Sequence, residues 1–335
     1  MIKLLKKHDF IQVLISLFAM KYLTLILLLF CSFYSVCQEK FSKEIGFVTD
    51  NDLYISKSRD RYYTSGIFIN YRFISHKKSQ SLEKLIYEWQ LGHEMYTPNK
   101  AIVTNIIFHD RPFAAHLYTG FKMDRIYKSK KIFSTNIQLG FIGPNALGKE
   151  VQDFIHNIYG FRKAVGWKHQ IKSALSLNFN FGYSHFLLKN KKNNLDVTWI
   201  NKVRLGSTFT NASVGLYGRF GFKALQSIVN SIAFNTNLNN NNNAGSRGIE
   251  SFLFVKPTLQ YAIYDATLQG SFLNTKSEVT KELIPIVFNI QIGYKFTVNR
   301  FNFGYIFNYN TSKSKGLKHT YGNKYGSIII NYLLH

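Results

Sequence analysis

The sequence has little of several things on which common soluble folds depend. Both cysteines, Cys31 and Cys37, lie in the first 37 residues, so the remaining 298 (335 − 37) contain none. A disulfide scaffold, a thiolate metal site and a cysteine nucleophile are therefore excluded from that part of the chain. Proline is scarce, at 5 residues, and only 18% of residues are charged, which excludes a disordered polybasic tail.

Acidic residues are also few, whereas aromatic residues are abundant. The 18 Asp and Glu residues face 42 Lys and Arg, and without residues 1–37 the net charge is 38 − 17 = +21. Aromatics make up 16% of the chain, with 30 Phe and 21 Tyr. High aromatic, Asn, Ser and Gly content with few helix formers favours an all-β protein. The length suits one large domain or two ordinary ones.

The N-terminus has the pattern of an export signal. Lys21 precedes the short apolar run 22–30, and small residues follow that run. We therefore predict a signal peptide over 1–37, with Met20 as an alternative start, and a mature chain over 38–335. The alternative is a membrane anchor, but the run is shorter than the ~20 apolar residues that a spanning helix needs.

No later segment is apolar enough for a transmembrane helix, and the chain instead alternates with a period of two. In 133–141 and 175–183, large apolar residues interleave with Ser, Asn, Gln and Gly. Strands of soluble sandwiches typically have ~5–6 residues, whereas a tilted strand that crosses a membrane needs ~9–11. The long two-faced strands predict a closed antiparallel transmembrane β-barrel, with apolar residues towards lipid and polar residues inside. A secreted sandwich is the alternative.

Twelve strands are predicted, and the segment 224–249 is interpreted as a polar loop. The count becomes fourteen if 228–234 and 267–273 are strands; both even numbers suit a bacterial barrel. The twelve spans are 44–54, 62–74, 85–96, 115–124, 131–142, 170–186, 194–206, 211–223, 250–264, 285–298, 300–311 and 325–335.

A periplasmic N-terminus would make the odd-to-even connections extracellular. The longest, 143–169, contains a predicted short helix over 146–159 with His156 on its polar face. The same rim receives Asn51 and Asp52 from the first strand and Thr64 from the second. Neighbouring strand residues point to opposite faces, so Asn51 and Asp52 can serve one site only if the strand bends or bulges there.

Three ordered blocks resemble the LpxR-type lipid A deacylases, an outer-membrane family. The first is Val48-Thr49-Asp50-Asn51-Asp52 with Asp60-Arg61-Tyr62-Tyr63-Thr64-Ser65-Gly66. The second is Asp110-Arg111-Pro112-Phe113-Ala114-Ala115-His116-Leu117-Tyr118-Thr119-Gly120. The third and strongest is Ile142-Gly143-Pro144-Asn145-Ala146-Leu147-Gly148-Lys149-Glu150-Val151-Gln152-Asp153-Phe154-Ile155-His156, followed by Gly166-Trp167.

The resemblance implies a twelve-stranded barrel in the Gram-negative outer membrane that removes an acyl chain from lipid A and requires calcium (Ca²⁺). It places the catalytic histidine on His156, and Asn51, Asp52 and Thr64 at the catalytic and metal site. The family's acidic residue just beyond the helix is replaced by Arg162. Partners would be lipid A or lipopolysaccharide, with no nucleic acid, and a monomer is expected. Substrate-binding roles are assigned to Lys100, Arg111, Lys149 and Gln152.

The chemistry expected is ester hydrolysis by an activated water, because no G-x-S-x-G motif is present. A neutral imidazole is a suitable base, since its ordinary pKa is ~6.5. Asp153, one turn from His156, is a candidate to orient the ring, although this spacing also gives an ordinary helix-surface pair. Two alternatives stay open: an outer-membrane phospholipase, which needs an Asn-His-Ser arrangement on the wall, and a non-catalytic porin or structural barrel.

Overall fold

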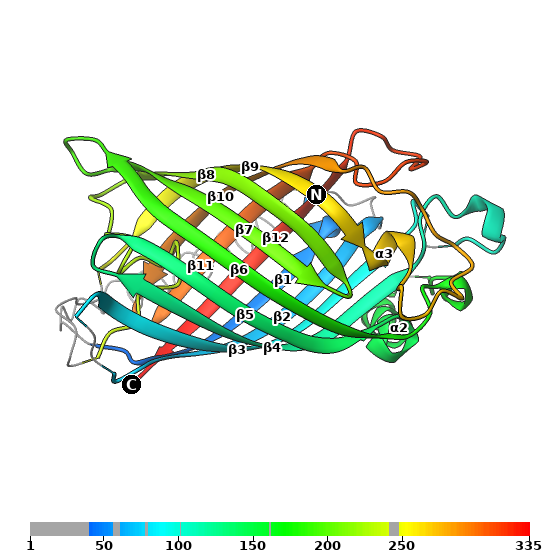
Figure 1. The fold of residues 1–335 in the computed structure, drawn as a ribbon, viewed down its shortest axis with the longest axis horizontal. Coiled ribbons are helices and arrows are strands. Elements are labelled where there is room, and N and C mark those ends of the chain that lie inside the picture. The colour runs from blue at the N-terminus through cyan, green and yellow to red at the C-terminus, as the bar shows by residue number, and fades with distance from the viewer. Residues whose placement is uncertain (1–39, 56–60, 78–79, 101, 161, 241–247) are drawn as a thin grey trace, which may run out of the picture. The chain divides into compact units, whose positions relative to one another are not determined.

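The fold is a closed antiparallel β-barrel in which each strand pairs with its neighbours in sequence and β1 pairs with β12 (Figure 1). The computed structural model describes residues 40–55, 61–77, 80–100, 102–160, 162–240 and 248–335. The predicted signal peptide over 1–37 lies outside them. The strands in this described part are β1 Lys43–Asn51, β2 Tyr62–Ile74, β3 Leu82–Thr97, β4 Ala114–Tyr127, β5 Lys131–Ile142, β6 Ala174–Lys189, β7 Leu195–Gly206, β8 Phe209–Gly221, β9 Ser251–Asp265, β10 Ile286–Val298, β11 Phe301–Asn310 and β12 Asn323–Leu334.

The predicted all-β barrel of twelve strands is confirmed, and the fourteen-strand alternative is wrong. Residues 228–234 form no strand, and the segment 267–273 begins within the short helix α3, Ala266–Gln269. Most strands have 12 to 16 residues, as the long period-two runs indicate. Within the described residues, no helix has both the length and the apolar character to cross a membrane.

The two ends of the barrel differ. We call the end where β1 begins and β12 finishes the terminal end, and the opposite end the helical end. The helical end carries α3 and α2, Gly148–Tyr159, which Figure 1 shows together at one end with the C-terminus at the other. Rings on neighbouring strands contact one another near the terminal end, for example Tyr87 and Phe121 with centroids 5.7 Å apart, as in the aromatic girdle of a membrane barrel.

The β8–β9 connection folds into the barrel instead of into solvent. We call residues 225–240 the plug segment. Ile228 and Leu238 are wholly buried and pack with the inward-facing Ile86 and Leu333. The segment is a loop, as predicted. Although most of its residues are polar, its few apolar residues pack in the barrel interior at the terminal end.

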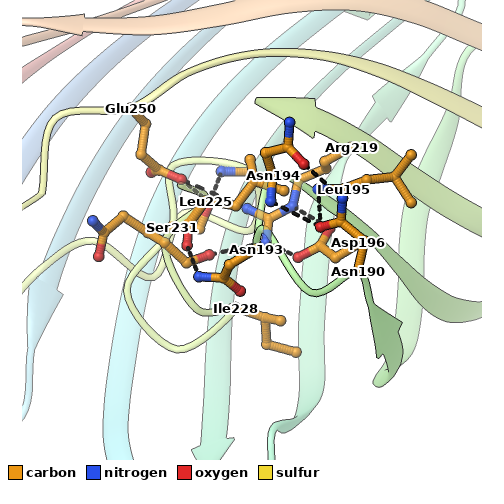
Figure 2. Close-up of polar contacts among 12 residues, drawn as sticks. Asn190, Asn193, Asn194, Leu195, Asp196, Arg219, Leu225, Ile228, Ser231 and Glu250 are labelled. Carbon is orange, nitrogen blue, oxygen red and sulfur yellow. Dashed lines mark hydrogen bonds and ion pairs between the residues drawn. The ribbon is translucent and has the colours of Figure 1, made fainter. Parts of the chain in front are cut away.

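Buried ion pairs and backbone contacts hold the plug segment in place. Arg219 on β8 is bound to Asp196 through Nε (2.9 Å) and Nη2 (2.5 Å), and its Nη1 donates to Ser231 at 2.6 Å (Figure 2). Ser231 in turn donates to Glu250 at 2.7 Å. The Nζ of Lys84 on β3 donates to a plug carbonyl oxygen at 2.8 Å. Since these groups come from opposite sides of the barrel, the segment crosses the interior at its terminal end.

Candidate functional site

The chain turns sharply where β1 ends, so that two neighbouring polar residues leave the strand geometry. Asn51 is the last residue of β1, and Asp52 begins the 3₁₀ helix η1, Asp52–Tyr54. The Asn51 side chain accepts a hydrogen bond from the backbone N–H of Leu53 at 2.8 Å, capping that turn. The Asp52 carboxylate is buried and accepts from the backbone N–H of Arg61 at 2.8 Å. This is the bend that the sequence required for Asn51 and Asp52 to serve one site.

Thr64 lies beside this turn on the neighbouring strand. Asn51 pairs with Ser65, so Thr64 is one residue further towards the helical end. The β2–β3 pairing shifts register between Tyr63 and Ser65, which places Thr64 at an irregularity. Its hydroxyl oxygen lies 2.6 Å from that of Thr97 on β3, in a buried setting. Asn51, Asp52 and Thr64 therefore lie at the helical end of two adjacent strands, at one corner of the rim.

Helix α2 packs against the outside of the barrel wall, near the ends of β3 and β4. Glu94 and His116 face the interior, where they bond to each other at 3.1 Å. The alternating residues Met95 and Ala115 must face outward, and they are buried there in one cluster with Trp167, against which Val151 and Ile155 of α2 pack. Phe154 and Ile158, two other apolar residues of α2, stay exposed at 65% and 64%.

Close packing fixes the start of this helix. A Cβ on Gly148 would lie 2.5 Å from the Cβ of Ala115 and 2.6 Å from the Trp167 ring, so only glycine fits. The Nε2 of His93 on β3 lies 2.8 Å from the carbonyl oxygen of Ala146, just before the helix. Further along, the Trp167 indole N–H donates to the side-chain oxygen of Gln152 at 2.7 Å. The helix therefore sits rigidly on the wall.

His156 shares the buried face of α2 with Gln152, one turn away. Its Nδ1 lies 2.6 Å from the carbonyl oxygen of Arg162. A carbonyl only accepts, so this contact assigns the proton to Nδ1 and leaves Nε2 as the basic nitrogen of the neutral ring. Asp153 does not orient the ring as expected, because its carboxylate accepts from Lys149 at 2.8 Å.

The residues predicted to bind substrate differ in burial and lie in separate parts of the helical end. Gln152 lies within the α2 contact, Lys149 is on the exposed side of α2, and Lys100 is exposed in the β3–β4 connection. Arg111 is buried elsewhere: it donates to the carbonyl oxygen of Thr267 at 3.0 Å and lies over the inward-facing ring of Tyr96, 4.8 Å from its centroid. The structure therefore does not bring Arg111 to the outer face of the wall, and the binding roles of these residues remain predictions.

Asn51, Asp52 and Thr64, which we call the corner residues, carry the oxygen ligands that a hard cation prefers. Among the described residues, no three His, Cys, Asp or Glu side chains are placed to hold a metal ion. A metal here would depend on one carboxylate, Asp52, together with the amide oxygen of Asn51, the hydroxyl of Thr64, backbone carbonyls and water. Such all-oxygen sets suit calcium, and a single carboxylate suits a weak site.

A second group of hydrogen-bonded polar side chains, which was not predicted from the sequence, lies inside the barrel. Ser176 Oγ is 2.8 Å from Nε2 of His116, and Nδ1 of His116 is 3.1 Å from Glu94. This is the order of a catalytic triad. However, Ser176 and His116 are almost wholly buried, and Ser176 also accepts from Thr208 at 2.6 Å and Asn178 at 3.0 Å. The three residues come from β6, β4 and β3, and only strand register brings them together.

The chain is similar to known outer-membrane proteins. The family model described as "Outer membrane protein LpxR" matches residues 23–334. LpxR from Salmonella typhimurium has a similar structure, with a TM-score of 0.67 and 19% identity, covering 86% of this chain and 99% of that one. An outer membrane channel from Pseudomonas putida F1 has a TM-score of 0.45 and 7% identity, covering 90% and 98%. No curated protein matched the sequence.

Proposed function

Because the chain belongs to the LpxR family of outer-membrane proteins, we propose that it hydrolyses an acyl ester of lipid A, with His156 as the general base. The observation that carries this proposal is the placement of His156. It lies on the wall-facing side of α2, with its Nδ1 proton directed at a backbone carbonyl. The helix packs against β3 and β4, and β3 is the neighbour of β2, on which Thr64 lies.

The proton transfers follow from the tautomer. Nε2 accepts a proton from a water molecule as the water oxygen attacks the ester carbonyl carbon. The Arg162 carbonyl, 2.6 Å from Nδ1, stabilises the imidazolium that forms and holds the ring in one orientation. The same Nε2 then returns the proton to the sugar-side oxygen as the ester bond breaks. The products are a free fatty acid and a lipid A hydroxyl.

Calcium is the cation that we expect at the corner residues. When bound, it would stabilise negative charge on the ester carbonyl oxygen. Asn51, Asp52 and Thr64 would hold it, because the turn after β1 and the irregularity in β2 place these residues at neighbouring strand ends. The Asp52 carboxylate would supply the negative charge that a cation requires at a buried position.

The setting would be the outer membrane of a Gram-negative cell, with the helical end outside and export by the predicted signal peptide. The apolar outer surface of the strands would contact lipid directly, so a substrate in the outer leaflet could reach α2 from the membrane. Lys100, Lys149 and Gln152 are proposed for the polar part of lipid A, whereas Arg111 is buried away from the outer face of the wall. Phosphates would be attracted by the lysines. A monomer suffices, because one chain carries every proposed group.

The test is mass spectrometry of lipid A incubated with purified protein. His156→Ala should abolish fatty-acid release and still migrate as a folded barrel in unheated gels. EDTA should stop the native protein, and added calcium should restore it. Full activity of folded His156→Ala would refute the base, whereas activity that survives EDTA would refute only the metal.

A serine hydrolase is the second candidate, because Ser176, His116 and Glu94 have the connectivity of a triad. The burial of Ser176 and its orientation towards the interior argue against access by a lipid. Ser176→Ala distinguishes the two reactions: it should leave deacylation unchanged if His156 is the base and abolish it if Ser176 is the nucleophile. The plug segment argues against the porin alternative, since its apolar side chains pack inside the barrel at the terminal end.

A further inference from the structure

Lysines are concentrated at the edge of the terminal end. Nine of them lie at strand ends or in the connections there, from the start of β1 round to the residues after β8. Eight of these side chains are exposed, and that of Lys131 is partly exposed. Because consecutive strands are neighbours in the barrel, the nine charges form an arc along its edge. We call them the rim lysines: Lys43, Lys77, Lys128, Lys130, Lys131, Lys189, Lys191, Lys192 and Lys223.

The acidic residues at this end do not neutralise the rim lysines. Most of them are buried and paired with inward-facing cations: Glu44, Glu88, Asp124, Asp196 and Glu250. In the described part of the chain, this leaves Glu83 and the C-terminal carboxylate at the same end as the nine lysines. No ion pair joins a rim lysine to a carboxylate of the described residues. The Lys130 ammonium instead lies 4.9 Å from the centroid of the Phe186 ring.

Surface lysines at the helical end differ in this respect. Lys149 is paired with Asp153 at 2.8 Å, and Lys315 is paired with Glu282 at 2.6 Å. The chain therefore supplies counter-charges to exposed lysines at one end of the barrel and leaves the rim lysines without them. A surface with many charges of one sign repels itself, and an external anionic partner removes that repulsion.

The arc of rim lysines is continuous with the apolar outer surface of the strands. Lys43 alternates along β1 with Ile45 and Phe47, which are exposed on the outside at 48% and 42%. Its cross-strand partner is Phe73 of β2, and the centroid of that ring lies 5.4 Å from the centroid of the Tyr87 ring in the aromatic girdle. Lys43 therefore stands beside the girdle, at the depth where the hydrocarbon of a membrane gives way to head groups.

We propose that the rim lysines bind the head groups of anionic phospholipids in the leaflet at the terminal end. Lysines just beyond an aromatic girdle meet head-group phosphates, and their attraction grows with the net negative charge of the surface. The charges are spread along an arc, so they match a surface of many lipid molecules and not a single bound ion. Zwitterionic lipids offer little, because their own cation cancels the phosphate charge. This binding is separate from lipid A hydrolysis at the opposite end, and its test does not measure that reaction.

The test is quenching of Trp199 fluorescence by brominated lipids in bilayers of phosphatidylglycerol and phosphatidylcholine. Trp199 is 39% exposed on β7, the strand that follows the turn with Lys191 and Lys192. Trp89, which is also exposed, is replaced by phenylalanine throughout, whereas Trp167 is buried away from lipid. The binding constant of phosphatidylglycerol relative to phosphatidylcholine should be at least about fivefold, the effect of roughly one lysine near a charged surface. Salt at 1 M should abolish this preference, because it shortens the Debye length to ~3 Å.

The variant Lys191→Gln/Lys192→Gln, confined to the turn, should reduce the preference for phosphatidylglycerol at least about threefold. Lys276→Gln/Lys318→Gln removes the same charge from exposed positions at the helical end and should leave the preference unchanged. If the turn variant does not migrate as a folded barrel in unheated gels, Lys192→Gln alone replaces it and should still lower the preference.

Three outcomes would overturn the proposal. The first is equal affinity of the native protein for the two lipids at low salt. The second is a folded turn variant that keeps the full preference. The third is binding of soluble polyphosphate to the native protein in phosphatidylcholine bilayers without any preference for phosphatidylglycerol, which would identify a soluble polyanion as the partner of the rim lysines instead of a lipid surface.

Discussion

Replacing Arg219 by methionine should release the plug segment. The guanidinium is fully buried and makes four contacts within hydrogen-bond distance: two to Asp196 (2.9 and 2.5 Å), one to Ser231 (2.6 Å) and one to the carbonyl oxygen of Gln226 (3.0 Å) (Figure 2). Glu250 lies 3.6 Å away. Methionine keeps most of the volume of the side chain but removes the charge and every donor.

The magnitude follows from the partners that are left behind. Removing one member of a buried ion pair typically costs about 3–5 kcal/mol, because the other charge stays buried without compensation. At ~1.4 kcal/mol per factor of ten, the open state of the plug segment should become roughly two to three and a half orders of magnitude more populated. Burial already raises the pKa of Glu250, so we expect this residue to take up a proton in the variant and the loss to be smaller at low pH.

Hydrogen exchange measures this opening directly. The amide of Asn239, which donates to the Phe41 carbonyl at 2.8 Å, and the amide of Thr236, which donates to Ser231 at 3.1 Å, report on the plug segment. Both should exchange much faster in Arg219→Met, while amides in the strands away from the plug keep their protection. Arg125→Met, which removes an arginine above the Phe133 ring, is the matched control. Unchanged exchange at both amides in Arg219→Met would refute the idea that this network holds the plug.

Three other perturbations test the rim. Gly148→Ala places a Cβ 2.5 Å from that of Ala115, so it should displace α2 and abolish deacylation without loss of the folded barrel in unheated gels. Asp52→Asn should raise the calcium concentration needed for half-maximal activity at least about tenfold, because it removes the charge from the oxygen set. Burial lowers the pKa of His109 from its ordinary 6.5, so its neutral form is favoured in the native state. The stabilisation is complete above that value and decreases as the pH falls towards the native pKa. Exchange in residues 102–113 should therefore accelerate below about pH 6, and His109→Gln should remove that dependence.

The barrel was predictable from sequence because its determinant is local. Alternation along 133–141 sets both faces of a strand without reference to any other segment, and the observed β5 has the predicted bounds. The plug segment was not predictable. The spacing of Ile228, Ile232 and Leu238, four and six residues, does not distinguish a strand, a helix or a loop. The burial of Ile228 and Leu238 depends on contacts with residues such as Ile86 of β3, more than a hundred residues distant.

The candidate site, too, was predictable from the sequence only where local residues determine it. The contiguous motif around Asn51 and Asp52 carried the information for a turn, and the structure has the turn. Ring orientation did not follow from spacing: Asp153 stands one turn from His156 yet pairs with Lys149, and a backbone carbonyl takes the ring N–H instead. A carbonyl has no sequence signature, since every residue carries one.

Because α2 lies on the outer surface of the wall, the relevant substrate concentration for this protein is the concentration within the membrane. A substrate that arrives sideways through the leaflet is counted per unit of membrane area, so turnover should follow the mole fraction of lipid A in the bilayer or micelle. Dilution with inert detergent at a fixed total amount of substrate should therefore slow the reaction, whereas dilution with buffer should not.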